Sequence, residues 1–105
     1  MNNVEIEEIQ INEEGNLLVK PVENPSKMFR FIYRAEMEVD WNEDLERFTC
    51  PEPREWSYFD WYKQVIYAVV SEMGIILKTS NETNWRNISN ELKSQIENYV
   101  FKSST

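Results

Sequence analysis

The chain of 105 residues contains no histidine, one cysteine and two glycines. Histidine is the most common general base in enzymes, so its absence excludes Ser-His-Asp and Cys-His catalysis within one chain. A zinc site of ordinary composition is excluded for the same reason. Two isolated glycines cannot form the loop that cradles a nucleotide phosphate. We therefore predict a protein that is not an enzyme and that uses no metal and no cofactor.

Long apolar runs are also missing. No stretch approaches the roughly 18 apolar residues of a membrane-spanning helix, and residues 1–15 lack the basic and apolar regions of a secretory signal. The single Cys50 cannot form a disulfide within the chain, which fits a reducing compartment. We expect a cytoplasmic protein that binds no membrane, in which Cys50 is a buried structural thiol.

The net charge of −8 lies in the first half of the chain. Residues 1–56 carry 14 acidic and 6 basic side chains, whereas residues 57–105 carry five of each. An acidic surface repels phosphate backbones, so nucleic acid is not an expected partner, whereas a basic protein is. The same residues also fit the solvated face of a soluble domain. The predicted partner contacts are Glu5, Glu7, Glu8, Glu13 and Glu14.

Alternation of apolar and polar residues predicts two strands at the start of the chain. Residues 3–11 alternate except for a slip at Glu7 and Glu8, which indicates a bulge or a frayed start. Gly15 then supplies the positive φ of a tight turn. A second strand is predicted over residues 16–21.

The longest alternation in the sequence runs from Phe29 to Trp41, where every second residue is apolar. A strand sorts such residues into one apolar and one charged face, so we predict a strand over residues 28–41. A short turn leads to a further strand over residues 45–50, which closes a hairpin. On the charged face, Arg30, Arg34 and Arg47 can pair with facing glutamates.

The second half of the chain is predicted to contain two helices. Ser57 is a suitable N-cap with Asp60 three residues later, and Gly74 is a suitable C-cap, which indicates a helix over residues 57–73. A short strand over residues 75–78 and a polar loop follow. Ser89 caps the last helix. Two apolar stripes support these helices: Tyr58, Trp61, Tyr62, Val65, Val69 and Met73 in the first, and Leu92, Ile96, Tyr99 and Val100 in the second.

These elements predict an α+β fold. An antiparallel four-stranded meander is followed by a long helix, a short strand and a C-terminal helix, and both helices pack on one face of the sheet. We expect a single domain over residues 1–105, with a frayed tail at about 102–105. An open sheet edge and the many aromatic residues also predict a homodimer.

An aromatic small-molecule site is the alternative to a protein partner. Tyr33, Trp41, Trp56 and Trp85 are candidates to line it, and Glu72, at the edge of the first apolar stripe, is the candidate polar anchor. The competing interpretation is that the aromatic side chains fill the core and that Glu72 faces solvent.

The fragments "PREWSY" and "TNWRNI", within residues 29–89, resemble a family of small acidic bacterial proteins of uncharacterised function. Some proteins of this kind are carried on mobile gene cassettes such as integrons. The resemblance implies a bacterial cytoplasmic setting and a compact α+β domain, and it implies no activity.

Three classes of function remain compatible with the sequence. The leading hypothesis is a non-enzymatic interaction module that binds a protein partner, and its most specific form is an immunity or antitoxin protein that neutralises a basic toxin. The second is a small-molecule binder with an aromatic pocket. The third is an enzyme that uses only carboxylate, tyrosine or arginine groups.

Overall fold

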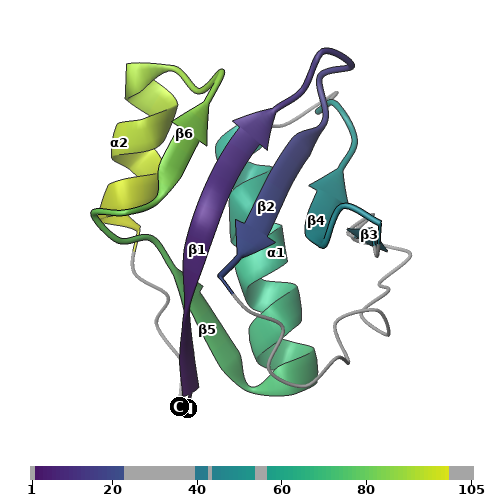
Figure 1. Cartoon of the computed structure of the whole chain (residues 1–105), viewed down its shortest axis with the longest axis vertical. Coiled ribbons are helices and arrows are strands. Elements are labelled where there is room, and N and C mark those ends of the chain that lie inside the picture. Colours follow the sequence, from purple (N-terminus) through teal and green to yellow (C-terminus); the bar gives the residue numbers. More distant parts are fainter. Residues whose placement is uncertain (1, 23–39, 43, 54–56, 100–105) are drawn as a thin grey trace.

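The computed structural model describes residues 2–22, 40–42, 44–53 and 57–99. In these residues the strands are β1 (Asn2–Ile11), β2 (Leu17–Pro21), β3 (Asp40–Asn42), β4 (Arg47–Cys50), β5 (Ile75–Lys78) and β6 (Asn84–Arg86). The helices are α1 (Tyr58–Met73) and α2 (Asn90–Asn98). The strands form one sheet in the order β3-β4-β2-β1-β5, with β6 paired to β1, and the two helices pack against it (Figure 1). The predicted α+β class is confirmed.

The hairpin of β1 and β2 contains the predicted bulge. Ile6 lies opposite Pro21 and Glu8 lies opposite Lys20, so Glu7 is the extra residue of β1. Two residues of a bulged strand oppose one residue of its partner, which restores the apolar alternation beyond the bulge. Apolar side chains on both sides of the bulge therefore face the same interior.

The turn between β1 and β2 is held by one asparagine and one glycine. The Asn12 side-chain oxygen accepts hydrogen bonds from the backbone N–H groups of Glu14 and Asn16, at 3.0 and 2.9 Å. Gly15 has a φ of 83°, a value that suits glycine far better than residues with a Cβ atom. The predicted turn is confirmed.

In the described residues, β4 lies between β2 and β3. Residues 23–39, which include most of the strand predicted over 28–41, lie outside the described residues. The strand predicted to begin at residue 45 begins at Arg47, because Glu46 has a φ of 53° and Leu45 donates its N–H to the Asn42 side chain. These two features form the turn that closes the β3–β4 hairpin.

Two short parallel strands share the other side of β1. β5 pairs with the first part of β1, and β6 pairs with its last residues, from Glu8 to Gln10. Between these two segments the buried Thr83 donates its hydroxyl to the Ile6 carbonyl at 2.7 Å. Residues 79–84 were expected to form a loop, so β6, which begins at Asn84, was not predicted.

The caps of α1 follow the sequence prediction. The Ser57 hydroxyl accepts a hydrogen bond from the Asp60 N–H at 3.2 Å, and the Asp60 carboxylate accepts one from the Ser57 N–H at 3.0 Å. This reciprocal capping box satisfies two backbone donors that the helix leaves free. At the other end Gly74 adopts a left-handed conformation, and its N–H bonds to the Val70 carbonyl.

The core lies between the sheet and the helices. Trp41 and Trp61 are both buried in it, which confirms that these aromatic side chains fill the interior. Burial of one large apolar side chain contributes about 1.5–3 kcal/mol, so this interior is the main favourable term in folding. Its largest fully buried side chains are Trp61, Phe48, Ile6, Ile9, Leu17, Ile66, Ile96, Val19 and Val65.

Candidate binding groove

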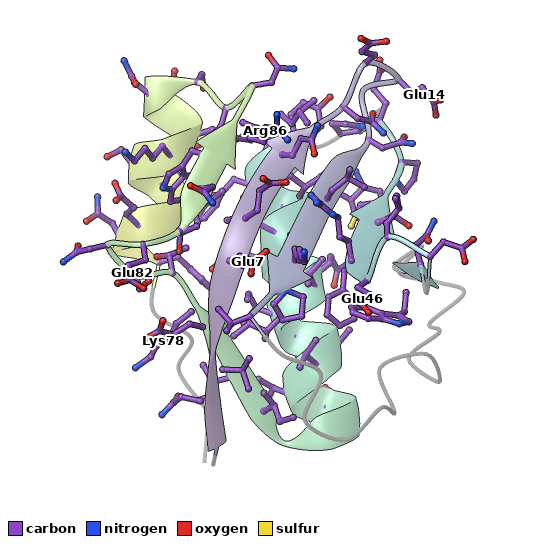
Figure 2. All side chains as sticks on the ribbon, viewed as in Figure 1. Glu7, Glu14, Glu46, Lys78, Glu82 and Arg86 are labelled. Carbon is purple, nitrogen blue, oxygen red and sulfur yellow. The ribbon has the colours of Figure 1, made fainter. Side chains whose placement is uncertain are left out.

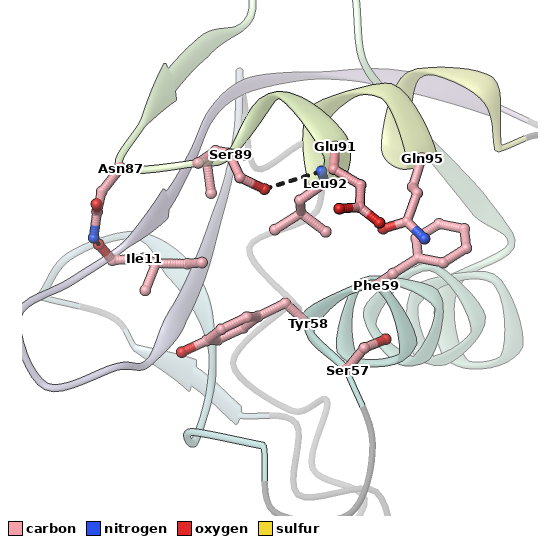
Figure 3. A pocket seen from close by; sticks show the side chains of 10 residues that line it. Ile11, Ser57, Tyr58, Phe59, Asn87, Ser89, Glu91, Leu92 and Gln95 are labelled. Carbon is pink, nitrogen blue, oxygen red and sulfur yellow. Dashed lines mark hydrogen bonds between the residues drawn. The ribbon is translucent and has the colours of Figure 1, made fainter.

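An open cavity of about 600 Å³ lies where the N-terminal ends of α1 and α2 face the end of β1 (Figure 3). We call it the α1–α2 groove. Its volume falls within the range of about 300–1,000 Å³ that is usual for ligand sites. Its apolar wall consists of Ile11, Tyr58, Phe59, Ile88 and Leu92, and its polar rim consists of Ser57, Asn87, Ser89, Glu91 and Gln95.

Two neighbouring aromatic residues of α1 form one side of the groove. Tyr58 donates its hydroxyl to the Gly15 carbonyl at 2.7 Å, which ties the start of α1 to the β1–β2 turn. Phe59 contacts the Tyr99 ring edge to face, with 5.8 Å between the ring centroids. The Lys63 ammonium lies 4.8 Å from the Phe59 ring centroid. Both aromatic side chains are therefore held in place by contacts with other elements.

The polar rim contains side chains that already form hydrogen bonds and side chains that form none with the described residues. The Asn87 amide donates to the Ile11 carbonyl at 2.8 Å, and the Ser89 hydroxyl accepts from the Leu92 N–H at 3.1 Å. Glu91 and Gln95 are exposed like Asn87 and Ser89, but their side chains form no hydrogen bond or ion pair with the described residues. They lie one turn apart on α2, facing the groove (Figure 3). These two side chains are available to contact a ligand.

A second carboxylate, that of Glu52, lies near the groove beside the hydroxyl end of Tyr58. A Cβ atom placed on Gly15 would collide with the Glu52 carboxylate, and Gly15 accepts the Tyr58 hydrogen bond. Burial, together with the negative charge of Glu52, raises the pKa of Tyr58. The phenol therefore stays protonated and keeps its hydrogen bond to the turn.

A smaller cavity of about 270 Å³ lies at the other end of α2. Tyr62 and Tyr99 line it together with Lys78 and Glu97. Burial raises the pKa of Tyr62, and the nearby Tyr99 adds to this effect. The rings of Tyr62 and Tyr99 meet edge to face, 6.0 Å apart, so this cavity is bounded by a packed aromatic pair.

The described members of the predicted aromatic site do not line the α1–α2 groove. Trp41 is buried against Phe48, with 4.8 Å between the ring centroids. Trp85 is half-buried on β6 and packs against the core. Tyr33 and Trp56 lie outside the described residues. Glu72 belongs to α1, and its side chain also lies outside the described part of the chain.

Two of the predicted partner contacts take part in ion pairs on the outer face of the sheet. Glu8 is 9% exposed and pairs with Arg47, and its other oxygen lies 3.8 Å from Arg86. Glu7 pairs with Lys20 at 3.0 Å. Arg47 therefore does pair with a glutamate, but Glu8 lies on β1, two strands away from β4, rather than on the facing strand of the predicted hairpin. Arg30 and Arg34 lie outside the described residues.

The other three predicted contacts, Glu5, Glu13 and Glu14, are exposed. Glu13 and Glu14 lie in the β1–β2 turn, and Figure 2 shows Glu14 at the tip of this hairpin, far along the strand from Glu7. The turn adjoins the groove through the hydrogen bond between Tyr58 and Gly15.

The α1–α2 groove was not predicted from the sequence. One signal was present, because Phe59 and Ile88 are apolar residues that lie outside the predicted helix stripes. An apolar side chain off the buried stripe must either be exposed or contribute to a second surface. Two such residues at the starts of two helices mark the groove wall.

Two other predictions concern the thiol and the membrane. Cys50 is buried, as predicted, and burial raises the pKa of its thiol to about 12. Neither helix in the described part of the chain is long and apolar enough to cross a membrane.

The fold and the groove define a small α+β protein with one open cavity between its helix starts. The family of the integron cassette protein Hfx_Cass5 matches residues 2–83, so the chain belongs to this family. A solved structure, described as the integron cassette protein Hfx_Cass5 from the mobile metagenome of the North West Arm sewage outfall, is 38% identical. The match covers 92% of this chain and 94% of that chain, with a TM-score of 0.45. No curated protein matches the chain. The predicted resemblance to integron cassette proteins is confirmed, and neither description states an activity.

Proposed function

We propose that the chain is a non-enzymatic binding module that holds a protein partner in the α1–α2 groove. The observation that carries this proposal is the open cavity of about 600 Å³ with an aromatic and aliphatic wall and a polar rim. Apolar walls with a few oriented polar groups are typical of binding sites.

The positions of the exposed acidic residues favour a protein over a small molecule. Glu13 and Glu14 lie in the turn that Tyr58 connects to the groove, so the negative surface extends beyond the cavity itself. A small molecule would occupy the cavity alone, whereas a protein would contact the turn as well. A basic partner of this kind would associate rapidly and with strong dependence on salt.

The homodimer predicted from the sequence stays a prediction. The described aromatic side chains Trp41 and Trp61 belong to the core, so these two residues do not support it, and its remaining basis is the sheet edge together with exposed residues such as Tyr67. Light scattering at high protein concentration would test it, and a mass of one chain would remove it.

The proposed site can be tested by blocking the groove. Gln95→Trp places a large side chain at the rim without touching the buried residues of α2, and Glu82→Trp places the same side chain on an exposed loop outside the groove. A panel of capped tripeptides with basic, acidic and neutral central residues is titrated into ¹⁵N-labelled protein. We expect shifts at the Ile11, Asn87 and Leu92 amides that disappear in Gln95→Trp and persist in Glu82→Trp.

No shift at these amides with any peptide would contradict the proposal, as would shifts that survive unchanged in Gln95→Trp. Binding of neutral aromatic fragments without any peptide binding would favour the small-molecule alternative.

A further inference from the structure

The charged side chains described at the α1–α2 groove are carboxylates. Glu91 lines the groove, and Glu52 lies beside the hydroxyl end of Tyr58. Among the described residues, no lysine or arginine lines the groove. Glu91 in the wall and Glu52 close by favour a negative potential in the cavity, and Lys63, a described cation next to the wall, lies over the Phe59 ring.

Nearby described cations are already paired. Lys63 lies 3.3 Å from the Asp60 carboxylate, and the Arg86 guanidinium lies 3.8 Å from Glu8 on the outer face of the sheet. Lys93, two residues after Glu91 on α2, lies over the Trp85 ring, with its ammonium 5.6 Å from the ring centroid. None of these three cations forms an ion pair with Glu91. An incoming positive charge would therefore meet a carboxylate that has no ion pair within the described part of the chain.

The starts of both helices border the groove, and a helix start carries a partial positive charge. In each helix the first turn contains a carboxylate that opposes this charge, Asp60 in α1 and Glu91 in α2. The Asp60 carboxylate is also fixed by the Ser57 N–H. The helix starts therefore do not reverse the negative sign of the groove.

The groove wall suits the stem of a long basic side chain. Tyr58 and Leu92 provide apolar surface below the rim that carries Glu91 and Gln95 (Figure 3). Lysine and arginine commonly pack their methylene groups on apolar surface while the charged group stays at the rim. An aromatic ring next to such a cation adds a further attraction.

We propose that a lysine or arginine side chain of the protein partner enters the α1–α2 groove and pairs with Glu91, with Gln95 as a second contact. Its stem packs on Tyr58, and Glu52 adds negative potential from the hydroxyl end of that ring. This inference rests on the proposed function, since it names the chemical group that the same site selects.

The test compares matched peptides on matched variants. The probes are acetyl-Ala-Arg-Ala-amide, its lysine analogue, and the analogue with citrulline, which has the shape of arginine without its charge. Glu91→Gln removes the groove carboxylate, and Glu82→Gln makes the same charge change at an exposed loop residue outside the groove. Dissociation constants come from ¹⁵N chemical-shift titrations at the Ile11 and Asn87 amides.

We expect the arginine and lysine peptides to bind about fivefold more tightly than the citrulline peptide, as one partly exposed ion pair allows. Glu91→Gln should abolish this preference, and Glu82→Gln should keep it. Equal binding of all three peptides at the groove amides would overturn the inference and leave the proposed function standing. Loss of the preference for the charged peptides in both variants would also overturn the inference. The overall negative charge of the protein would then explain the preference. No shift at the groove amides with any peptide would remove both proposals.

Discussion

Glutamates occupy two contrasting regions of this molecule. On the outer face of the sheet, Arg47 reaches from β4 across β2 to pair with Glu8 on β1, and it also donates to Gln10 at 3.3 Å. Leu18 lies on β2, the strand that Arg47 crosses. Its side chain is buried although it does not belong to the core between the sheet and the helices. At the α1–α2 groove, by contrast, Glu91 is exposed on a rim with no described basic side chain.

The difference shows that an acidic sequence is not the same as an acidic surface. Glu7 and Glu8 follow each other in the acidic first half of the chain, and both are engaged in ion pairs. Glu91 lies in the half of the chain with no net charge, and its carboxylate faces an open cavity. The first kind of glutamate specifies the fold, and the second kind is available to a partner.

Glu8→Gln should have the largest effect on stability. It would leave the partly buried Arg47 without its counter-charge, and we expect a loss of about 2 kcal/mol in the free energy of unfolding. Glu91→Gln, the same change at the groove, should alter this free energy by less than about 0.5 kcal/mol. Urea denaturation of the two variants and the parent measures the difference. Equal stability of the two variants would show that the outer ion pairs do not support the fold.

Ser57→Ala should have an intermediate effect, because it removes the N-cap of α1 at the edge of the groove. Loss of such a cap costs about 1 kcal/mol. Ser71→Ala, on an exposed position of the same helix, is the matched control and should be neutral or slightly stabilising. Thermal unfolding of both variants measures the two effects. A parent-like midpoint in Ser57→Ala would mean that the capping box adds nothing to stability.

The smallest expected effect is a dependence on pH from Asp60. The hydrogen bond from the Ser57 backbone N–H is the main cause that lowers the pKa of this carboxyl below its ordinary value of 3.8. A carboxyl whose pKa is lower in the folded state than in the unfolded state stabilises the fold at pH values above its unfolded-state pKa. This stabilisation is lost as the pH falls through the folded-state pKa. Because Asp60 is largely solvated, we expect about 0.5 kcal/mol. The difference in the free energy of unfolding between the parent and Asp60→Asn, measured in urea, should therefore become smaller below pH 3.8. A difference that does not change with pH would contradict a stabilising role for the ionised Asp60 carboxylate.

Local signals in the sequence predicted the parts of the fold that local chemistry determines. The slip at Glu7 and Glu8 indicated the bulge, and Ser57, Asp60 and Gly74 indicated both ends of α1. Each of these features depends on residues within a few positions of one another, so a short stretch contains the needed information.

Features that depend on distant residues were harder to predict. β6 is only three residues long, and its pairing with β1 joins residues more than 70 positions apart, including the Thr83 bond to Ile6. The position of β4 beside β2 likewise depends on the packing of the whole sheet. The groove depends on the placement of two helix starts, so its residues had no common sequence motif. Trp41 was a candidate ligand contact because a tryptophan in a core and one in a pocket look alike in sequence.

The most direct test of the account is one ratio, namely the affinity for the arginine tripeptide divided by that for its uncharged citrulline analogue. In the parent protein this ratio should be about five, and replacement of Glu91 by glutamine should bring it to about one. A ratio near one in the parent, with both peptides seated in the cavity, would contradict the assignment of Glu91 as the residue that selects the partner's charge.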